Sequence, residues 1–179
     1  MPGIEAVGRA GQVGFVAPGL LQFLREASQA FPDFNKEMRK AAEEVAQVVV
    51  DKAKVNAAGQ PKHGPNRRGS SGRSQAQAVV EGLRARRDRI PTIKLDAKRG
   101  YVSASRPNRK RKTKVRMGDV FFGAEFGGRA QPTTQQFLRH RGRQGYFFWQ
   151  AVRDSKSYIA KEYSDAIERV LKKLAAGAT

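Results

Sequence analysis

The chain has 179 residues, a length that suits one domain with a core of ordinary size, so residues 1–179 are expected to form a single domain. It has no cysteine, which excludes disulfides, thiolate chemistry and cysteine-ligated zinc. The net charge is +19, and residues 61–116 carry eighteen Lys and Arg against three acids. Such a segment attracts polyanions, so DNA or acidic protein surfaces are the expected partners, and a basic arm that is merely solvated is the alternative.

The N-terminal residues 1–19 are expected to form an arm. Glu5 and several glycines precede any apolar run, which does not fit a signal peptide. No apolar run in the chain approaches the roughly 20 residues that cross a bilayer, so no membrane partner is expected.

Residues 20–55 are expected to be helical. A short apolar helix ends before Pro32, and Asp33 stands at the N-cap position of the next one. That second helix is amphipathic, because its apolar residues follow i, i+3, i+4 spacing. They are Met38, Ala41, Ala42, Val45, Val48 and Val49.

Residues 56–73 change to Gly, Pro, Ser, Asn and basic residues, the composition of a loop or arm. Residues 74–128 are expected to hold a helical turn and then strands near 79–86, 90–95 and 101–105. A fourth strand starts at Val120, because Val120, Phe122 and Ala124 alternate with Phe121, Gly123 and Glu125. A basic hairpin, residues 106–116, joins the last two strands.

A segment rich in Pro and aromatic residues, 129–150, precedes an amphipathic C-terminal helix, 151–179. The expected fold class is α+β: an antiparallel sheet of about four strands packed against the long helix of the N-terminal half and against the C-terminal helix, with extended basic loops. In this register Phe126 shares a face with Val120 and Phe122, so it is expected in the core, where truncation to Ala costs about 3–5 kcal/mol.

Catalytic chemistry finds little support in the sequence. The two histidines, His63 and His140, lie in basic surroundings with no carboxylate nearby in the sequence. Asp119 and Glu125 invite a magnesium-dependent nuclease interpretation, but no acid-x-Lys pair follows on the expected strand. Glu125 is expected instead to make an interface or turn contact. We therefore expect no catalytic, cofactor-binding or metal-ligating residues, no cofactor, and a protein that is not an enzyme.

The basic segment has two tips with no aromatic residues interleaved, which favours contacts with phosphates or acidic surfaces over base readout. The candidate contacts are Arg67, Arg68, Arg73, Arg109, Lys110, Arg111, Lys112, Lys114 and Arg116.

Four features stand in a recognisable order: Ala124-Glu125-Phe126-Gly127, Gln131-Pro132, Phe137-Leu138 and the amphipathic helix after Asp154. This order resembles the tail-completion (neck) proteins of long-tailed bacteriophages, most closely versions from phages of actinobacteria. The resemblance covers roughly residues 20–175 and departs at Gly127-Gly128, where many relatives have Gly followed by Thr. It implies family-motif or interface roles for Glu125, Phe126, Gly127, Pro132, Phe137 and Leu138.

The resemblance implies a structural protein of the virion that is assembled in the host cytoplasm and completes the tail at the neck. It would form a homo-oligomeric ring, most often a hexamer, that joins the tail to the capsid vertex around the DNA channel. Neighbouring tail-terminator, stopper or adaptor, or tail-tube proteins would be its partners, and the genomic DNA would pass through it. A nonspecific nucleic-acid-binding protein of ribosomal or nucleoid type is the alternative that the charge leaves open.

Overall fold

The computed structural model describes residues 5–7, 12–16, 19–31, 33–61, 74–101, 115–128 and 137–176. Contacts along the chain group into two compact units. The first unit comprises Met1–Val49, Arg84–Lys94 and Ser155–Thr179, and the second comprises Val50–Leu83 and Leu95–Asp154. The expectation of a single domain stays a prediction.

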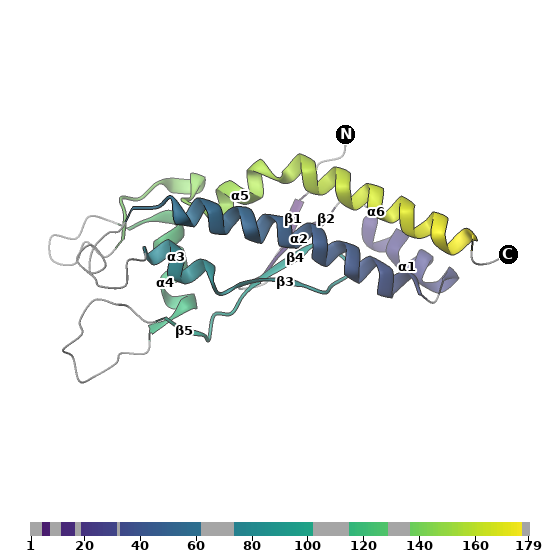
Figure 1. Ribbon diagram of the computed structural model, residues 1–179, viewed down its shortest axis with the longest axis horizontal. Coiled ribbons are helices and arrows are strands. Elements are labelled where there is room, and N and C mark those ends of the chain that lie inside the picture. The colour runs from purple at the N-terminus through teal and green to yellow at the C-terminus, as the bar shows by residue number, and fades with distance from the viewer. Residues whose placement is uncertain are drawn as a thin grey trace. The chain divides into compact units, whose positions relative to one another are not determined.

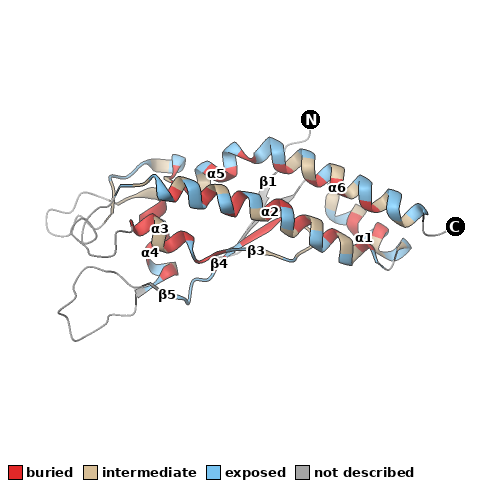
Figure 2. Ribbon diagram, in the orientation of Figure 1, coloured by how far each residue is buried: buried red, intermediate tan, exposed pale blue. Residues whose placement is uncertain are grey.

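Three helices supply the core of the first unit: α1 (Leu20–Ala30), the first part of α2 (Phe34–Ala58) and α6 (Lys156–Ala176) (Figure 1). Figure 2 shows the buried positions recurring along α2 as the helical period requires. The buried cluster consists of Leu24, Ala27, Phe34, Met38, Ala42, Tyr163 and Val170. The helices expected from apolar spacing are therefore confirmed, and α2 continues three residues beyond the predicted end at residue 55, into the expected arm.

Strands also form where the sequence suggested only an arm. β1 (Glu5–Val7) pairs antiparallel with β2 (Gln12–Val16), and β2 pairs antiparallel with β4 (Thr92–Leu95). β3 (Leu83–Arg86) follows β4 in the strand order β1-β2-β4-β3. The sequence analysis expected an arm here and placed no strand in these residues. The segment Gln-Val-Gly-Phe-Val is rich in residues that favour strands, which its flanking glycines obscured.

The second unit begins with the end of α2 and continues with the short helix α3 (Gln75–Val80). Ser74 caps α3: its hydroxyl accepts the N–H of Gln77 at 3.1 Å, and the Gln77 side chain accepts the N–H of Ser74 at 2.7 Å. The expected helical turn leading into a strand is therefore confirmed as α3 followed by β3.

The predicted strand at Val120 is wrong, because residues Met117–Phe126 form a helix, α4. Apolar side chains occupy nearly every face of α4, so the alternation that suggested a strand carries no information about its period. Asp119 begins the helix by accepting the N–H of Arg116 at 3.2 Å, and Gly127 ends it with a φ of +77°.

The helical geometry also overturns the burial expected for Phe126. Phe126 is only half-buried, and Phe122, expected on the same inward face, is 66% exposed. Phe121 is the buried ring instead. It makes edge-on contacts with Phe147 and Phe148 at centroid distances of 6.1 and 5.9 Å. A helix turns about 100° per residue, which places Phe121 and Phe122 on different faces.

The other strands and the C-terminal helix also differ from expectation. Tyr101 lies in β5 (Gly100–Tyr101), which pairs antiparallel with β6 (Val115–Arg116) in a separate sheet. The expected C-terminal helix is two helices, α5 (Phe148–Asp154) and α6, interrupted at Ser155. The α+β class with antiparallel pairing is confirmed. Among the described residues, no helix has the length and apolar character that crossing a membrane requires.

Candidate functional site

The buried carboxylate of Glu125 holds the start of α5. One oxygen accepts the backbone N–H of Trp149 at 2.8 Å, and the other accepts those of Phe148 and Phe147 at 2.9 and 3.2 Å. The first N–H groups of a helix have no partner within the helix, so an acceptor must come from elsewhere. No Ser, Thr, Asp or Asn precedes α5, and Glu125 from α4 takes the place of such a cap.

The end of α2 binds the carbonyl groups of the same segment. Asn56 Nδ2 donates to the carbonyl of Phe147 at 3.2 Å, and Gln60 Nε2 donates to that of Tyr146 at 3.0 Å. Lys52 Nζ donates to the carbonyl of Asp154, at the end of α5, at 3.3 Å. Side chains of α2 and of Gln60 just beyond it therefore hold α5 at both ends by donating to carbonyls, while Glu125 accepts three N–H groups at the start of α5.

Two opposing effects act on the ionisation of Glu125. Burial in the second unit raises the pKa of its carboxyl, and the N–H groups of Phe148, Trp149 and Phe147 lower it. The raising effect is the larger, so the pKa lies above its ordinary value. The contact is structural, since all of its partners are backbone groups of the same chain.

Three glycines of the second unit stand where a side chain would not fit, and one of them lies against this carboxylate. A Cβ on Gly145 would overlap a carboxylate oxygen of Glu125, and one on Gly123 would overlap the ring of Phe137. A Cβ on Gly127 would overlap the carbonyls of Leu138 and Arg139, and the positive φ at Gly127 also favours glycine. Two backbone hydrogen bonds, both 2.9 Å, hold the end of α4 against the segment that begins at Phe137. The Gly128 N–H donates to the Leu138 carbonyl, and the Arg141 N–H donates to the Phe126 carbonyl.

The residues expected from the family motif thus contribute to one structural cluster, as far as the structure describes them. Glu125 accepts a hydrogen bond from Phe147, Gly127 lies against the carbonyl of Leu138, and the Phe137 ring lies against α4 at Gly123. Phe126 stacks on Phe122 at a centroid distance of 6.3 Å. Pro132 lies outside the described residues.

Most of the expected basic contacts also lie outside the described residues: Arg67, Arg68, Arg73, Arg109, Lys110, Arg111, Lys112 and Lys114. Arg116 is described and is exposed in β6, which pairs with β5.

The nuclease interpretation gains nothing from the described residues. Asp119 is exposed and caps α4, while Glu125 on the same helix is fully buried and occupied by backbone N–H groups. In the described part of the chain, no three His, Asp or Glu side chains come together as a metal would require. His63 is outside the described residues, and His140 is exposed.

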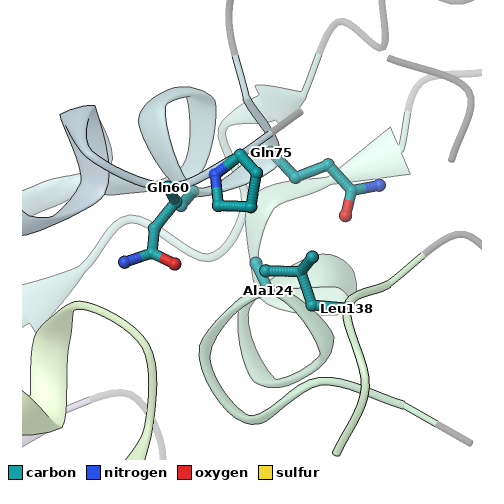
Figure 3. A pocket seen from close by; sticks show the side chains of 6 residues that line it. Gln60, Gln75, Ala124 and Leu138 are labelled. Atoms are coloured by element: carbon teal, nitrogen blue, oxygen red, sulfur yellow. The ribbon is translucent and has the colours of Figure 1, made fainter. Parts of the chain in front are cut away.

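A small hollow lies beside this cluster, between Gln60, Pro61, Gln75, Ala76, Ala124 and Leu138 (Figure 3). It has room for about one water molecule, far less than a substrate needs. The amide groups of Gln60 and Gln75 and the side chain of Leu138 border it in Figure 3.

Sequence reasoning missed the partners of Glu125, which are the backbone N–H groups of Phe147, Phe148 and Trp149. It also missed Asn56 and Gln60, which donate to the carbonyls of the same segment. One signal could have indicated them: a helix begins at Phe148 with no capping residue before it, and Gly145 stands just upstream. The chain matches no model of a protein family, no curated protein and no solved structure.

Proposed function

We propose that the chain is a structural protein of a tailed-phage virion that completes the tail at the head-to-tail connection. The observation that carries the proposal is the use made of the motif. Glu125, Gly123 and Gly127 join α4 to α5 and to the segment that begins at Phe137, so the motif serves the architecture of the subunit, which supports a structural role.

A subunit of a ring must also present a contact surface to its neighbours, and α4 offers one. Phe122 is 66% exposed and stacks on Phe126 with 12° between the ring planes. Aromatic side chains are enriched at protein interfaces. In the proposal, the side chains of Phe122 and Phe126 contact an adjacent copy of the chain. Six copies form the oligomeric ring around the DNA channel.

The rest of the proposal follows the family resemblance. The antiparallel sheet packs against the long helix and the C-terminal helix, and the ring stacks against tail-terminator, stopper or tail-tube proteins. The basic tips reach DNA or acidic faces of these neighbours. The positive net charge of +19 also favours a second candidate, a nonspecific nucleic-acid-binding protein that acts as a monomer.

Two measurements test the proposal. Mass spectrometry of purified virions is expected to find peptides of this chain, and their absence contradicts the virion assignment. Native mass spectrometry of the purified chain is expected to show a ring that Phe122→Ser weakens and Leu21→Ser, at another exposed apolar residue, does not. A chain that stays monomeric at high concentration and binds DNA in a salt-dependent way supports the second candidate.

A further inference from the structure

A second basic surface, distinct from the tips expected from the sequence, lies on the loop before α5. No acid occurs between Glu125 and Asp154, and the described arginines of this stretch are Arg139, Arg141, Arg143 and Arg153. All four are exposed. We refer to residues 139–143 as the arginine loop.

The backbone of the arginine loop is held in one conformation by side chains from its own unit. Tyr146 Oη donates to the carbonyl of Arg139 at 2.6 Å. The guanidinium of Arg153, on α5, donates to the carbonyl of Arg143 at 3.0 Å and to that of Gln144. Arg141, in the middle of the loop, also donates its backbone N–H to the carbonyl of Phe126. Binding therefore requires little further ordering of the loop.

The charged groups of the loop have no acidic partner within the described part of the chain. The described ion pairs involve other residues, and the nearest acid before the loop in sequence, Glu125, is buried against backbone N–H groups. Several cations held close together without acids repel one another, and an anion relieves that repulsion.

The type of cation indicates the type of anion. The loop has arginine and no lysine, and a guanidinium donates two parallel hydrogen bonds to a phosphate. Among the described residues, Tyr146 is the aromatic side chain found against one of these cations: the guanidinium of Arg141 lies over its ring, 5.3 Å from the centroid. That face of the ring is covered, which favours contacts to phosphates over stacking with bases.

We propose that the arginine loop binds the phosphate backbone of duplex DNA without sequence preference, with Arg153 as a positioning residue. This inference does not rest on the neck assignment, because a monomeric DNA-binding protein could carry the same surface. The isolated full-length chain suffices to test it.

The test compares two variants that lose the same charge. Arg139→Gln, Arg141→Gln and Arg143→Gln together remove the loop cations, and Arg84→Gln, Arg87→Gln and Lys94→Gln remove three exposed cations elsewhere. Fluorescence anisotropy with a duplex of arbitrary sequence measures affinity between about 50 and about 200 mM salt. The salt slope is the change in the logarithm of the binding constant with the logarithm of the salt concentration, and each lost phosphate contact lowers its magnitude by about 0.9. The magnitude of the slope is therefore expected to fall by about 2–3 in the loop variant and by less than about 1 in the control.

An equal loss in both variants, or no loss in the loop variant, overturns the proposal. Titration with poly-glutamate separates phosphate from acidic protein: if the loop variant loses affinity for poly-glutamate as strongly as for DNA, the loop is a site for carboxylates and the phosphate assignment is wrong. Circular dichroism confirms that both variants are folded.

Arg153→Lys tests the positioning role. Lysine keeps the charge but cannot donate in fork geometry to the carbonyls of Arg143 and Gln144. We expect DNA affinity to fall severalfold while the salt slope stays within about 0.5 of the wild type. Arg84→Lys, at an exposed arginine outside the arginine loop, is the matched control and is expected to bind DNA as the wild type does. If Arg153→Lys binds as the wild type does, Arg153 does not position the loop.

Discussion

The carboxylate of Glu125 lies against the N-terminus of α5, which would otherwise have no capping side chain. A negative charge at this end of a helix also interacts favourably with the helix dipole. Burial opposes both effects, because it disfavours the charged form. Three donors on one fully buried carboxylate make substitution of this residue costly.

Glu125→Gln is expected to lower the free energy of unfolding by about 1–3 kcal/mol. A glutamine has a single carbonyl oxygen, so its amide NH₂ must face at least one of the N–H groups of Phe147, Phe148 and Trp149 and leave it unpaired. Urea unfolding measures the change. Glu44→Gln, at an exposed acid on α2, is the control and is expected to change stability by less than about 0.5 kcal/mol. Equal stability of the two variants contradicts the capping role.

The pH dependence of stability tests the raised pKa of Glu125. A carboxyl whose pKa is higher in the folded than in the unfolded chain stabilises the fold most when it is protonated. The difference in unfolding free energy between the wild type and Glu125→Gln is therefore expected to be largest below the ordinary pKa of 4.5 and to shrink as pH rises through the raised pKa. If this difference in unfolding free energy instead grows as the pH rises, the N–H groups lower the pKa of Glu125 by more than burial raises it.

At the scale of elements, α4 shows how one helix serves two environments. Phe121 packs edge-on against Phe147 and Phe148, while the neighbouring Phe122 is exposed and contacts Phe121 and Phe126. The two adjacent rings differ in burial and not in chemistry, so they form a matched pair.

Phe121→Ala is expected to cost about 3–5 kcal/mol of stability, because it leaves a cavity among buried rings. Phe122→Ala is expected to cost far less in the isolated chain, within about 1 kcal/mol, since its ring is mostly in water. Chemical denaturation of both variants decides it. Equal losses of stability in the two variants would contradict a helix at these residues. A larger loss from Phe122→Ala would favour the strand expected from the sequence, in which Phe122 faces inward and Phe121 does not.

For the whole molecule, the dominant quantity is the net charge of +19, concentrated in residues 61–116. Self-repulsion of like charges opposes compaction, and salt screens it over about 10 Å at 0.1 M. The folded chain therefore pairs a stable helical core with a charge distribution that favours polyanionic partners.

Changing Arg109, Lys110, Arg111 and Lys112 to Ser lowers the net charge from +19 to +15. We expect stability at moderate salt to change by about 0.5 kcal/mol or less, and the gain in stability on adding salt to be smaller than in the wild type. Thermal unfolding over a salt series measures both effects. In the proposed virion role, the same variant reduces joining of heads to tails in vitro. Joining at the wild-type rate at every salt concentration would show that the tips are merely solvated.

The helices of the first unit could be predicted from the sequence alone. In α1, α2 and α6, apolar residues recur at the helical period, because one face of each is buried and the other is in water. The charge distribution and the capped start of α3 at Ser74 are likewise local properties. Local patterns therefore determined the α+β class and the position of these helices.

Only the tertiary structure decided the state of α4 and the role of Glu125. A helix with apolar residues on nearly all faces has no period to detect, and six alternating residues fit a short strand equally well. The partners of Glu125 lie 22 to 24 residues further along the chain, so no local pattern contains them. The arginine loop became recognisable as a site for the same reason: its conformation depends on Tyr146 and Arg153, which only folding brings to its backbone.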